Sequence, residues 1–507
     1  MGNTVDSNIT GLRFAEEASI GVLPTTPVWY PLEPNSYNDF GGQLKTMARN
    51  PINPTRQRKK GVVTDLDASG GFVQDLTQTG LTRLLQGFLF AALRQKASTL
   101  PLNGTQVVIT GVTTAADTYA AASGLGIFAA DDLLLASNFS NPMNNGMKHV
   151  SSATSTTVVV DTDTVDEAAP PSNASLQKVG KQLAAGVASI STASGYPRLV
   201  LSAGNPTTWG LIPGEWIYIG GDAAATRFAL AANNGFVRIR SIAATYIEFD
   251  KTSGVAVTDA GATKTLQLFW GNVLKNESTA ALIARRTYQL ERTLGSDAVG
   301  VQSEYLVGAV PSEMSLEVKQ ADKITTTLSF MATDNEHRNG TTGVKSGTRP
   351  TLLDSPAFNT SSDFSRVKLH QVTDGVTDPD PLFAYFTEMT LTLKNNLSPN
   401  KAVAVLGAFD MAAGTFEVGA SVTAYFSEVA AIAAVRNNAD VSLDFAVVKG
   451  NAGLLFDLPL VSLGDGRLKV EQDKAITLPL TIEAAVGSAG HTLLLNEFPY
   501  LPTVAEG

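Results

Sequence analysis

The sequence predicts a mainly β protein in which one β domain is present twice. Charged residues make up only 17% of the chain, against about a quarter in typical soluble domains. Thr, Ser, Ala, Val and Gly are used instead, which favours strands joined by many turns. At 507 residues the chain is too long for a single core. The stretch from Gly70 to Ala91 also has a counterpart in residue type and spacing at Gly414 to Val435, 344 positions later.

The repeated element is a strand followed by a short helix. Phe72, Gln74 and Leu76 alternate and therefore share one face of the strand. An apolar run with helical spacing follows, from Leu81 to about Phe90. Under the 344 shift, the matching apolar positions of the second occurrence are Phe416, Tyr425, Val429 and Ile432.

Net charge and cysteine content exclude several classes of protein. With 37 basic and 47 acidic residues, the net charge is −10, so the chain does not grip nucleic acid by neutralising phosphate. The absence of cysteine excludes disulfides, thiolate metal sites and a cysteine nucleophile. The first residues lack the basic and apolar regions of a secretory signal, and the apolar run from Leu81 to Leu93 is too short to span a bilayer. We expect a soluble protein made in a cytoplasm, with no membrane partner.

The N-terminal 35 residues are expected to form an extended segment. This segment contains four prolines, which have no backbone N–H to donate to a neighbouring strand, so it is not expected to form a central strand. Trp29 and Tyr30 lie between them and are candidates for contact with a neighbouring subunit. Packing of the two aromatic side chains on their own domain is an equally good interpretation.

A hairpin is expected over residues 36–80, with the most basic loop of the chain between its strands, residues 49–60. Its cations include Arg56, Arg58, Lys59 and Lys60. A subunit contact through salt bridges, a solvated loop and a nucleic-acid patch are three interpretations. No aromatic residue is interleaved with the cations, which disfavours the third.

A second repeat, with a spacing of 89 residues, lies inside the first copy of the domain. Asn144-Asn145-Gly146 and Asn233-Asn234-Gly235 each precede an apolar strand. Asn-Gly favours a type I′ hairpin turn, because both residues tolerate positive φ. We therefore expect two small β modules, at about 103–175 and 190–270.

The closing strands of the domain repeat with a third spacing. Leu316, Val318, Ile324 and Leu328 match Leu468, Val470, Ile476 and Leu480, all 152 positions later. Because this shift is 192 residues smaller than 344, the first copy is longer by that amount, and two modules account for 178 of it. The expected domains are a first copy at 1–100 and 275–345, a two-module insertion at 101–274, a linker at 346–380 and a second copy at 381–507.

Motifs of known chemistry are missing from the sequence. The four histidines are far apart, and no metalloprotease, phosphate-binding or nucleophile-elbow motif is present. The sequence gives no reason to expect a catalytic residue, a metal site or a cofactor. We expect a structural protein, although distant carboxylates could still form a glycosidase pair.

The chain resembles the major tail tube protein of long-tailed, non-contractile bacteriophages. The segment from Ala15 to Trp29 is similar to the E-x-x-x-G-x-x-P-x-x-P-x-W opening of that family. The Gly70-Gly71-Phe72 strand, the short helix and a closing hairpin from Pro311 to Met331 follow in family order.

The resemblance implies a β-sandwich or half-barrel domain flanked by a short helix. Subunits of the family form rings, the rings stack, and their hairpins join into a β-barrel around a channel through which DNA is ejected. Because the domain is doubled in this chain, three chains would form a pseudo-six-fold ring; a true hexamer is the alternative. The expected partners are the chain itself, the tape measure protein, other tail proteins and, transiently, phage DNA. The expected location is the virion tail, assembled in the bacterial cytoplasm. A secretion tube or surface-layer subunit is the second interpretation.

An acidic channel wall would repel phosphate and keep DNA mobile. Asp65, Asp67 and Asp75 share one parity on their strand and, with Glu417, are candidates for lining the lumen. Under the 344 shift, the counterparts of the three aspartates are Phe409, Met411 and Gly419. An acidic ring is therefore not expected from equivalent positions alone.

Overall fold

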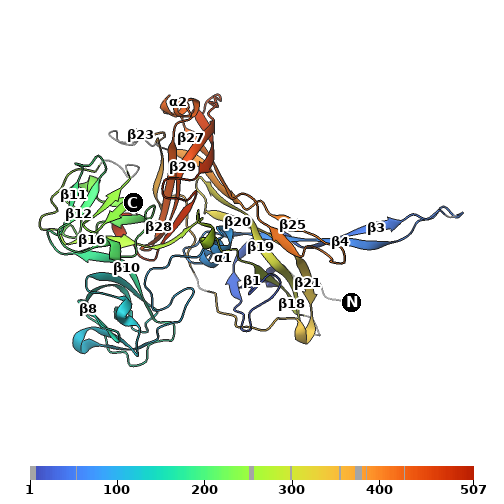
Figure 1. Ribbon diagram of the computed structural model, residues 1–507, viewed down its shortest axis with the longest axis horizontal. Coiled ribbons are helices and arrows are strands. Elements are labelled where there is room, and N and C mark those ends of the chain that lie inside the picture. Colours follow the sequence, from blue (N-terminus) through green and yellow to red (C-terminus); the bar gives the residue numbers. More distant parts are fainter. Residues whose placement is uncertain are drawn as a thin grey trace.

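The computed structural model describes residues 7–52, 54–250, 256–296, 300–352, 355–371, 380–383, 385–427 and 429–506. The described chain is mainly β, as predicted, with large antiparallel sheets and two short α-helices. Figure 1 shows three parts: a central body, a long hairpin that projects from it, and a lobe on the opposite side.

Eight antiparallel strands form a continuous layer through the body, which we call the main ribbon. Each strand of the ribbon pairs with the next one across the layer. From one edge to the other, the strands are β3 (Pro34–Arg49), β4 (Lys59–Asp75), β20 (Thr325–Ala332), β19 (Val301–Lys319), β24 (Phe386–Lys394), β27 (Glu417–Tyr425), β30 (Thr477–Ala485) and β29 (Ala452–Asp465).

The main ribbon has one apolar face and one polar face, because side chains alternate along each strand. Buried apolar residues occupy one face, including Phe72, Leu328, Met314, Leu391, Val422 and Leu480. Half-buried or exposed polar residues occupy the other, including Asp75, Thr327, Glu317, Thr390, Ser421 and Thr481. The apolar face belongs to a single hydrophobic core that runs through both halves of the ribbon.

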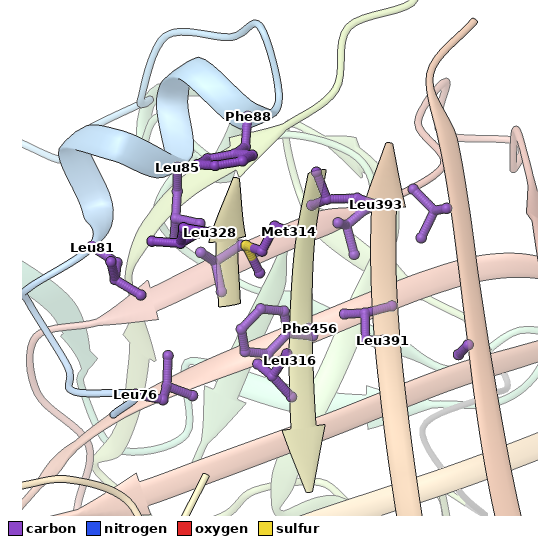
Figure 2. Close-up of a cluster of buried hydrophobic side chains, with 14 of the residues drawn as sticks. Leu76, Leu81, Leu85, Phe88, Met314, Leu316, Leu328, Leu391, Leu393 and Phe456 are labelled. Carbon is purple, nitrogen blue, oxygen red and sulfur yellow. The ribbon is translucent and has the colours of Figure 1, made fainter. Parts of the chain in front are cut away.

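Helix α1 (Thr82–Phe88) covers part of this apolar face. Figure 2 shows Leu85 and Phe88 of the helix pointing towards Leu328 and Met314 of the strands. The helix ends earlier than the expected Phe90, because Phe90 adopts a left-handed backbone with φ of 48°. Helix α2 (Ala430–Arg436) is the second copy's counterpart and contacts β29.

A second layer closes each half of the body, and the two halves use the same strand order. In the first half the order is β2 (Tyr30–Leu32), β1 (Gly11–Glu16), β18 (Tyr288–Ser296), the start of β19, then β21 (Asp334–Arg338). In the second half the order is β23 (Asp380–Pro381), β22 (Phe364–Gln371), β28 (Val441–Lys449), the start of β29, then β31 (Leu494–Phe498). β17 (Asn272–Lys275) extends the second of these layers beside β31.

Strand pairing corrects the register of the repeat. Leu328 lies opposite Phe72, and Leu480, 152 positions after Leu328, lies opposite Val422. Because Val422 follows Phe72 by 350 positions, the 344 shift expected from the sequence is wrong by six residues. A slip by an even number keeps every apolar side chain on the same face, so apolar spacing alone does not detect it.

A second correction concerns the closing strand of the second copy. The strand expected over residues 468–471 is absent, since β29 ends at Asp465 and residues 466–476 form an exposed connection to β30. Leu468 and Val470 lie in this connection with exposed fractions of 39% and 71%. Their counterparts Leu316 and Val318 are buried within β19.

The lobe consists of two six-stranded modules with one strand order. The first contains β5 (Ile109–Thr113), β6 (Thr118–Ala121), β9 (Thr157–Val160), β8 (Gly146–Ala153), β7 (Asp132–Ser137) and β10 (Ser175–Leu183). The second contains β11 (Ala188–Ser191), β12 (Arg198–Leu201), β15 (Tyr246–Phe249), β14 (Gly235–Ala243), β13 (Trp216–Ile219) and β16 (Leu266–Trp270). Each has its own hydrophobic cluster, and β10 pairs with β16 to join them.

The Asn-Asn-Gly segments act differently from the expected type I′ turn. Asn145 and Asn234 are extended, with φ of −96° and −108°. Each asparagine side chain instead binds the preceding loop. The Phe139 amide N–H donates to the Asn145 side-chain oxygen, and the Phe228 amide N–H donates to the Asn234 side-chain oxygen, both at 2.9 Å. The repeat thus marks a side-chain-stapled loop rather than a hairpin.

A buried ion pair attaches the lobe to the second half of the body. The Arg238 guanidinium of β14 contacts the Asp457 carboxylate of β29 at 2.9 Å, and both side chains are buried. Arg366 pairs with Asp444 in the same region. Such pairs fix orientation, because losing one partner leaves an uncompensated buried charge.

The burial of Glu497 on β31 can be tested by measurement. Its carboxyl is buried, and desolvation raises its pKa to about 7 despite hydrogen bonds that involve Asn272 and Thr82. The folded state therefore keeps a proton that the unfolded state releases above its ordinary pKa of 4.5. This difference destabilises the fold increasingly as pH rises from 4.5 to 7.

We predict that Glu497→Gln removes this penalty. The variant should unfold with a free energy about 3 kcal/mol higher than the unmodified protein at pH 8, and about equal to it at pH 4.5. Denaturant unfolding at the two pH values measures the difference. An effect of equal size at both would contradict the assigned protonation of Glu497.

Candidate assembly surfaces

The projecting hairpin is the most exposed part of the body. Beyond Gln43 and Thr64, β3 and β4 leave the main ribbon and extend far from it (Figure 1); we call residues 44–63 the arm. Its exposed apolar side chains are Leu44, Met47, Ile52, Val62 and Val63. A monomer rarely exposes such a row, which is typical of a surface covered by another chain.

The predicted basic cluster lies at the tip of the arm. Arg56, Arg58, Lys59 and Lys60 are all exposed. Among the described residues, none of these four cations forms an ion pair. Their place at a distal tip keeps the subunit-contact interpretation open.

Trp29 and Tyr30 are placed differently from the basic cluster. The Trp29 side chain is fully buried against Ala15 and Tyr305, and its indole N–H donates to the Ser346 carbonyl at 3.0 Å. Of the two interpretations left open, the structure has the indole on its own domain, so Trp29 is not an exposed contact. Tyr30 is half-buried and lies under the Arg83 guanidinium, 4.3 Å from its ring centre.

A flap in the second copy corresponds to the arm. By strand pairing, Lys394 and Glu417 match Gln43 and Asp67. The intervening stretches have nearly equal length, residues 395–416 against 44–66. In the second copy the stretch folds back as β25 (Ser398–Asn400) and β26 (Asp410–Ala412) near the base of the arm (Figure 1).

Ion pairs connect the flap to the arm base. Lys401 of the flap contacts Asp65 at 2.6 Å and Asp67 at 2.5 Å, and Lys45 also pairs with both. Hydrogen bonds from Lys401 lower the pKa of both carboxyl groups, and Lys45 adds to the effect. Asp65 and Asp67, predicted as lumen residues, are therefore ionised and neutralised by lysines.

The other two predicted lumen residues lie on the polar face of the main ribbon. Asp75 contacts Lys323 at 2.8 Å and is 27% exposed. Glu417 is exposed and lies opposite Lys394 on the neighbouring strand. With the corrected register, Glu417 occupies the position of Asp67, so one acidic position is shared by both copies, contrary to the expectation from the 344 shift.

Further acidic residues on this face were missed from the sequence. Glu317, Glu388 and Glu483 point to the polar side of β19, β24 and β30. The signal was available, because each glutamate alternates with buried apolar neighbours such as Leu316 and Val318. Lys319 and Lys394 lie among them, and Lys323 is a further cation on this face.

Comparison with known proteins identifies the family. A family model described as "Phage tail tube protein" matches residues 7–484. A search of curated proteins found no match. Within the described residues, no helix has the length and apolar character that crossing a membrane requires. The match covers almost the whole chain, with both halves of the body and the lobe, and we conclude that the chain belongs to the phage tail tube protein family, as a structural component of the virion tail.

Proposed function

We propose that this chain is the repeating subunit of a tail tube whose stacked rings enclose a channel for DNA. The observation that carries the proposal is the main ribbon. Its apolar face is covered by helices and second-layer strands, whereas its polar face is not packed into the core. Such a ribbon suits the wall of a water-filled channel when several copies are joined around an axis.

Three chains would complete a pseudo-six-fold ring. Each chain would supply two copies of the tube domain, expected at 1–100 with 275–345 and at 381–507, and the segment expected as a linker, 346–380, contributes β22 to the second copy. The two-module insertion expected at 101–274 would correspond to the lobe, whose strands β5 to β16 lie on the side opposite the arm (Figure 1). Placed outside the ring, the lobe would decorate the tail. Rotation by one subunit closes such head-to-tail contacts into a ring.

The polar face would line the channel. Glu317, Glu388, Glu417 and Glu483 give it more acidic than basic side chains. Like charge keeps a phosphate backbone from adhering, so DNA could move along the wall without being held.

The arm would join successive rings. It projects away from the body and exposes apolar side chains along its length. Burial of these side chains against the next ring would give stacking a hydrophobic contribution. The tip cations would add ion pairs, which are weaker in salt.

Other tail components would meet the assembled tube. The tape measure protein would occupy the channel before DNA does, and other tail proteins would contact the ends of the tube. We place assembly in the cytoplasm of the bacterial host, and we assign the chain no catalytic role.

Electron microscopy of the purified protein tests the proposal. We expect rings or hollow tubes with three-fold or pseudo-six-fold symmetry. Six complete chains per ring would replace the trimer by a hexamer, and a flat lattice would favour a surface-layer protein. Monomers at every concentration tested would refute a tube subunit.

Shortening the arm should separate ring formation from stacking. We predict that replacing residues 46–64 by Asn-Gly, which joins Lys45 to Asp65 through a two-residue turn, leaves rings intact and abolishes tubes. Tube length by electron microscopy and sedimentation measure the effect.

A matched variant keeps the arm and changes Arg56, Arg58, Lys59 and Lys60 to Gln. If apolar contacts dominate stacking, this variant still forms tubes. Tubes of normal length from the shortened chain would refute the role of the arm.

Charge reversal on the polar face should slow DNA passage. We predict that Glu388→Lys, Glu417→Lys and Glu483→Lys together preserve tubes, because the three side chains are exposed, and reduce the rate of genome release at least about tenfold at low salt. Release from phage carrying the variant measures this.

The control places the same charge change on the lobe, as Asp131→Lys, Asp161→Lys and Asp163→Lys. These aspartates are exposed on the first module. Equal slowing by both variants would contradict a channel wall at the polar face.

A further inference from the structure

The two copies of the domain are joined edge to edge within one chain. β19 pairs with β24 through seven consecutive residue pairs, from Glu313 opposite Lys394 to Lys319 opposite Glu388. Leu316 and Val318 are buried at this junction, as are Leu391 and Met389 opposite them. The core therefore passes from one copy to the other without a break.

The main ribbon ends in two edges that correspond to the two sides of this junction. At one edge lies the first part of β3, which among the described residues pairs only with β4. At the other edge lies the end of β29. β28 covers β29 as far as Val461, and among the described strands none pairs with that side beyond it.

Strand pairing aligns these edges with the internal junction. β18 pairs with β19 as far as Ala309, and β28 pairs with β29 as far as Val461, which lies 152 positions after Ala309. Beyond Ala309, β19 pairs with β24. β29 has no such partner strand beyond Val461 among the described strands. On the other side, Met389 lies opposite Val422, as Tyr37 lies opposite Phe72 in the first copy. The free edge of β3 is thus the counterpart of the paired edge of β24.

The exposed connection after β29 carries the side chains that such a junction requires. Residues 465–471 are the counterparts of residues 313–319, and Leu468 and Val470 match Leu316 and Val318. Leu316 and Val318 are 0% and 2% exposed, against 39% and 71% for Leu468 and Val470. In the single chain, Lys469 between them pairs with Thr477 of β30, and among the described residues no strand pairs with the opposite side of this segment.

We propose that residues 466–471 become an extension of β29 when rings form, by pairing antiparallel with residues 36–42 of a second copy of this chain. The inference rests on the proposed tube function and specifies its subunit contact. Glu471 then lies opposite Ser36 of the neighbour, and Val470 opposite Tyr37. Residues 466–471 of one subunit thus form a strand that pairs with β3 of the next subunit. Around each ring, the internal β19–β24 junction alternates with an intermolecular junction that has the same strand pairing.

Two features of the chain favour a strand at this place. The free edge offers backbone N–H and C=O groups that do not pair with β4 and can template another strand, although the Phe40 carbonyl accepts a hydrogen bond from Arg292 at 3.2 Å. The partner segment carries Tyr37 and Phe40, whose rings pack against the core, so Leu468 and Val470 would gain apolar neighbours as they leave water.

The internal junction also shows where a disulfide should form. The Gln320 amide donates to the Thr387 carbonyl at 3.1 Å, which makes this a hydrogen-bonded pair. The adjacent pair, Lys319 with Glu388, is therefore a non-hydrogen-bonded pair, whose Cα atoms lie closest. Its predicted intermolecular counterpart is Glu471 with Ser36, and both residues are exposed.

Cysteine pairing tests the proposal on a chain that has no cysteine of its own. We expect mild oxidation of assembled Ser36→Cys/Glu471→Cys protein to join most chains by intermolecular disulfides into closed trimers. The control Ser36→Cys/Lys469→Cys places the second thiol two residues along the strand, beyond disulfide reach, and should link at least about tenfold less.

Hydrogen exchange gives a second measurement that needs no substitution. Amides of Leu468 and Val470 should exchange at least about 100-fold more slowly in tubes than in monomers, whereas those of Gly466 and Lys469 already donate to Pro479 and Thr477 in the single chain. Tubes that form without the cross-link and without this protection would overturn the inference and leave the proposed function intact. Failure of the unmodified protein to form rings or tubes would overturn both.

Discussion

Backbone pairing between β19 and β24 is the interaction on which the rest of the body depends. It places two copies of a domain side by side in one layer, so that a single hydrophobic core serves both. Without this pairing, Leu316, Val318, Met389 and Leu391 would be exposed at two open edges. An open strand edge favours further pairing. The chain pairs two such edges internally, at β19 and β24, and among the described strands leaves two corresponding edges unpaired, at β3 and at the end of β29.

The two copies differ mainly in what is attached to a common frame. Both have a ribbon of four strands, a seven-residue helix and a second layer in the same order. The first copy carries the lobe between α1 and β18 and holds its long connection extended as the arm. The second copy folds a connection of nearly equal length into the flap, where Lys401 holds it against Asp65 and Asp67.

Sequence reasoning identified the strand–helix element, both internal repeats and the acidic parity of β4, because alternation and spacing are local properties. It misplaced the register by six residues, since Phe416 and Val422 both suit the apolar face. It also missed the ion pairs of Asp65 and Asp67, because Lys401 is more than 300 positions away and only tertiary folding brings it near. The burial of Trp29 was likewise undecided, as it depends on Tyr305 and Ser346.

Covalent fusion of the copies has a consequence for how they can change. Two separate proteins that alternate around a ring would have to be made in equal amounts and to recognise each other in preference to themselves. A single chain fixes both the ratio and the alternation by its peptide bonds. Each copy is thereby free to diverge, and in the proposed ring an appendage carried by one of them, such as the lobe or the arm, would occur at every second position and leave the intervening positions uncrowded.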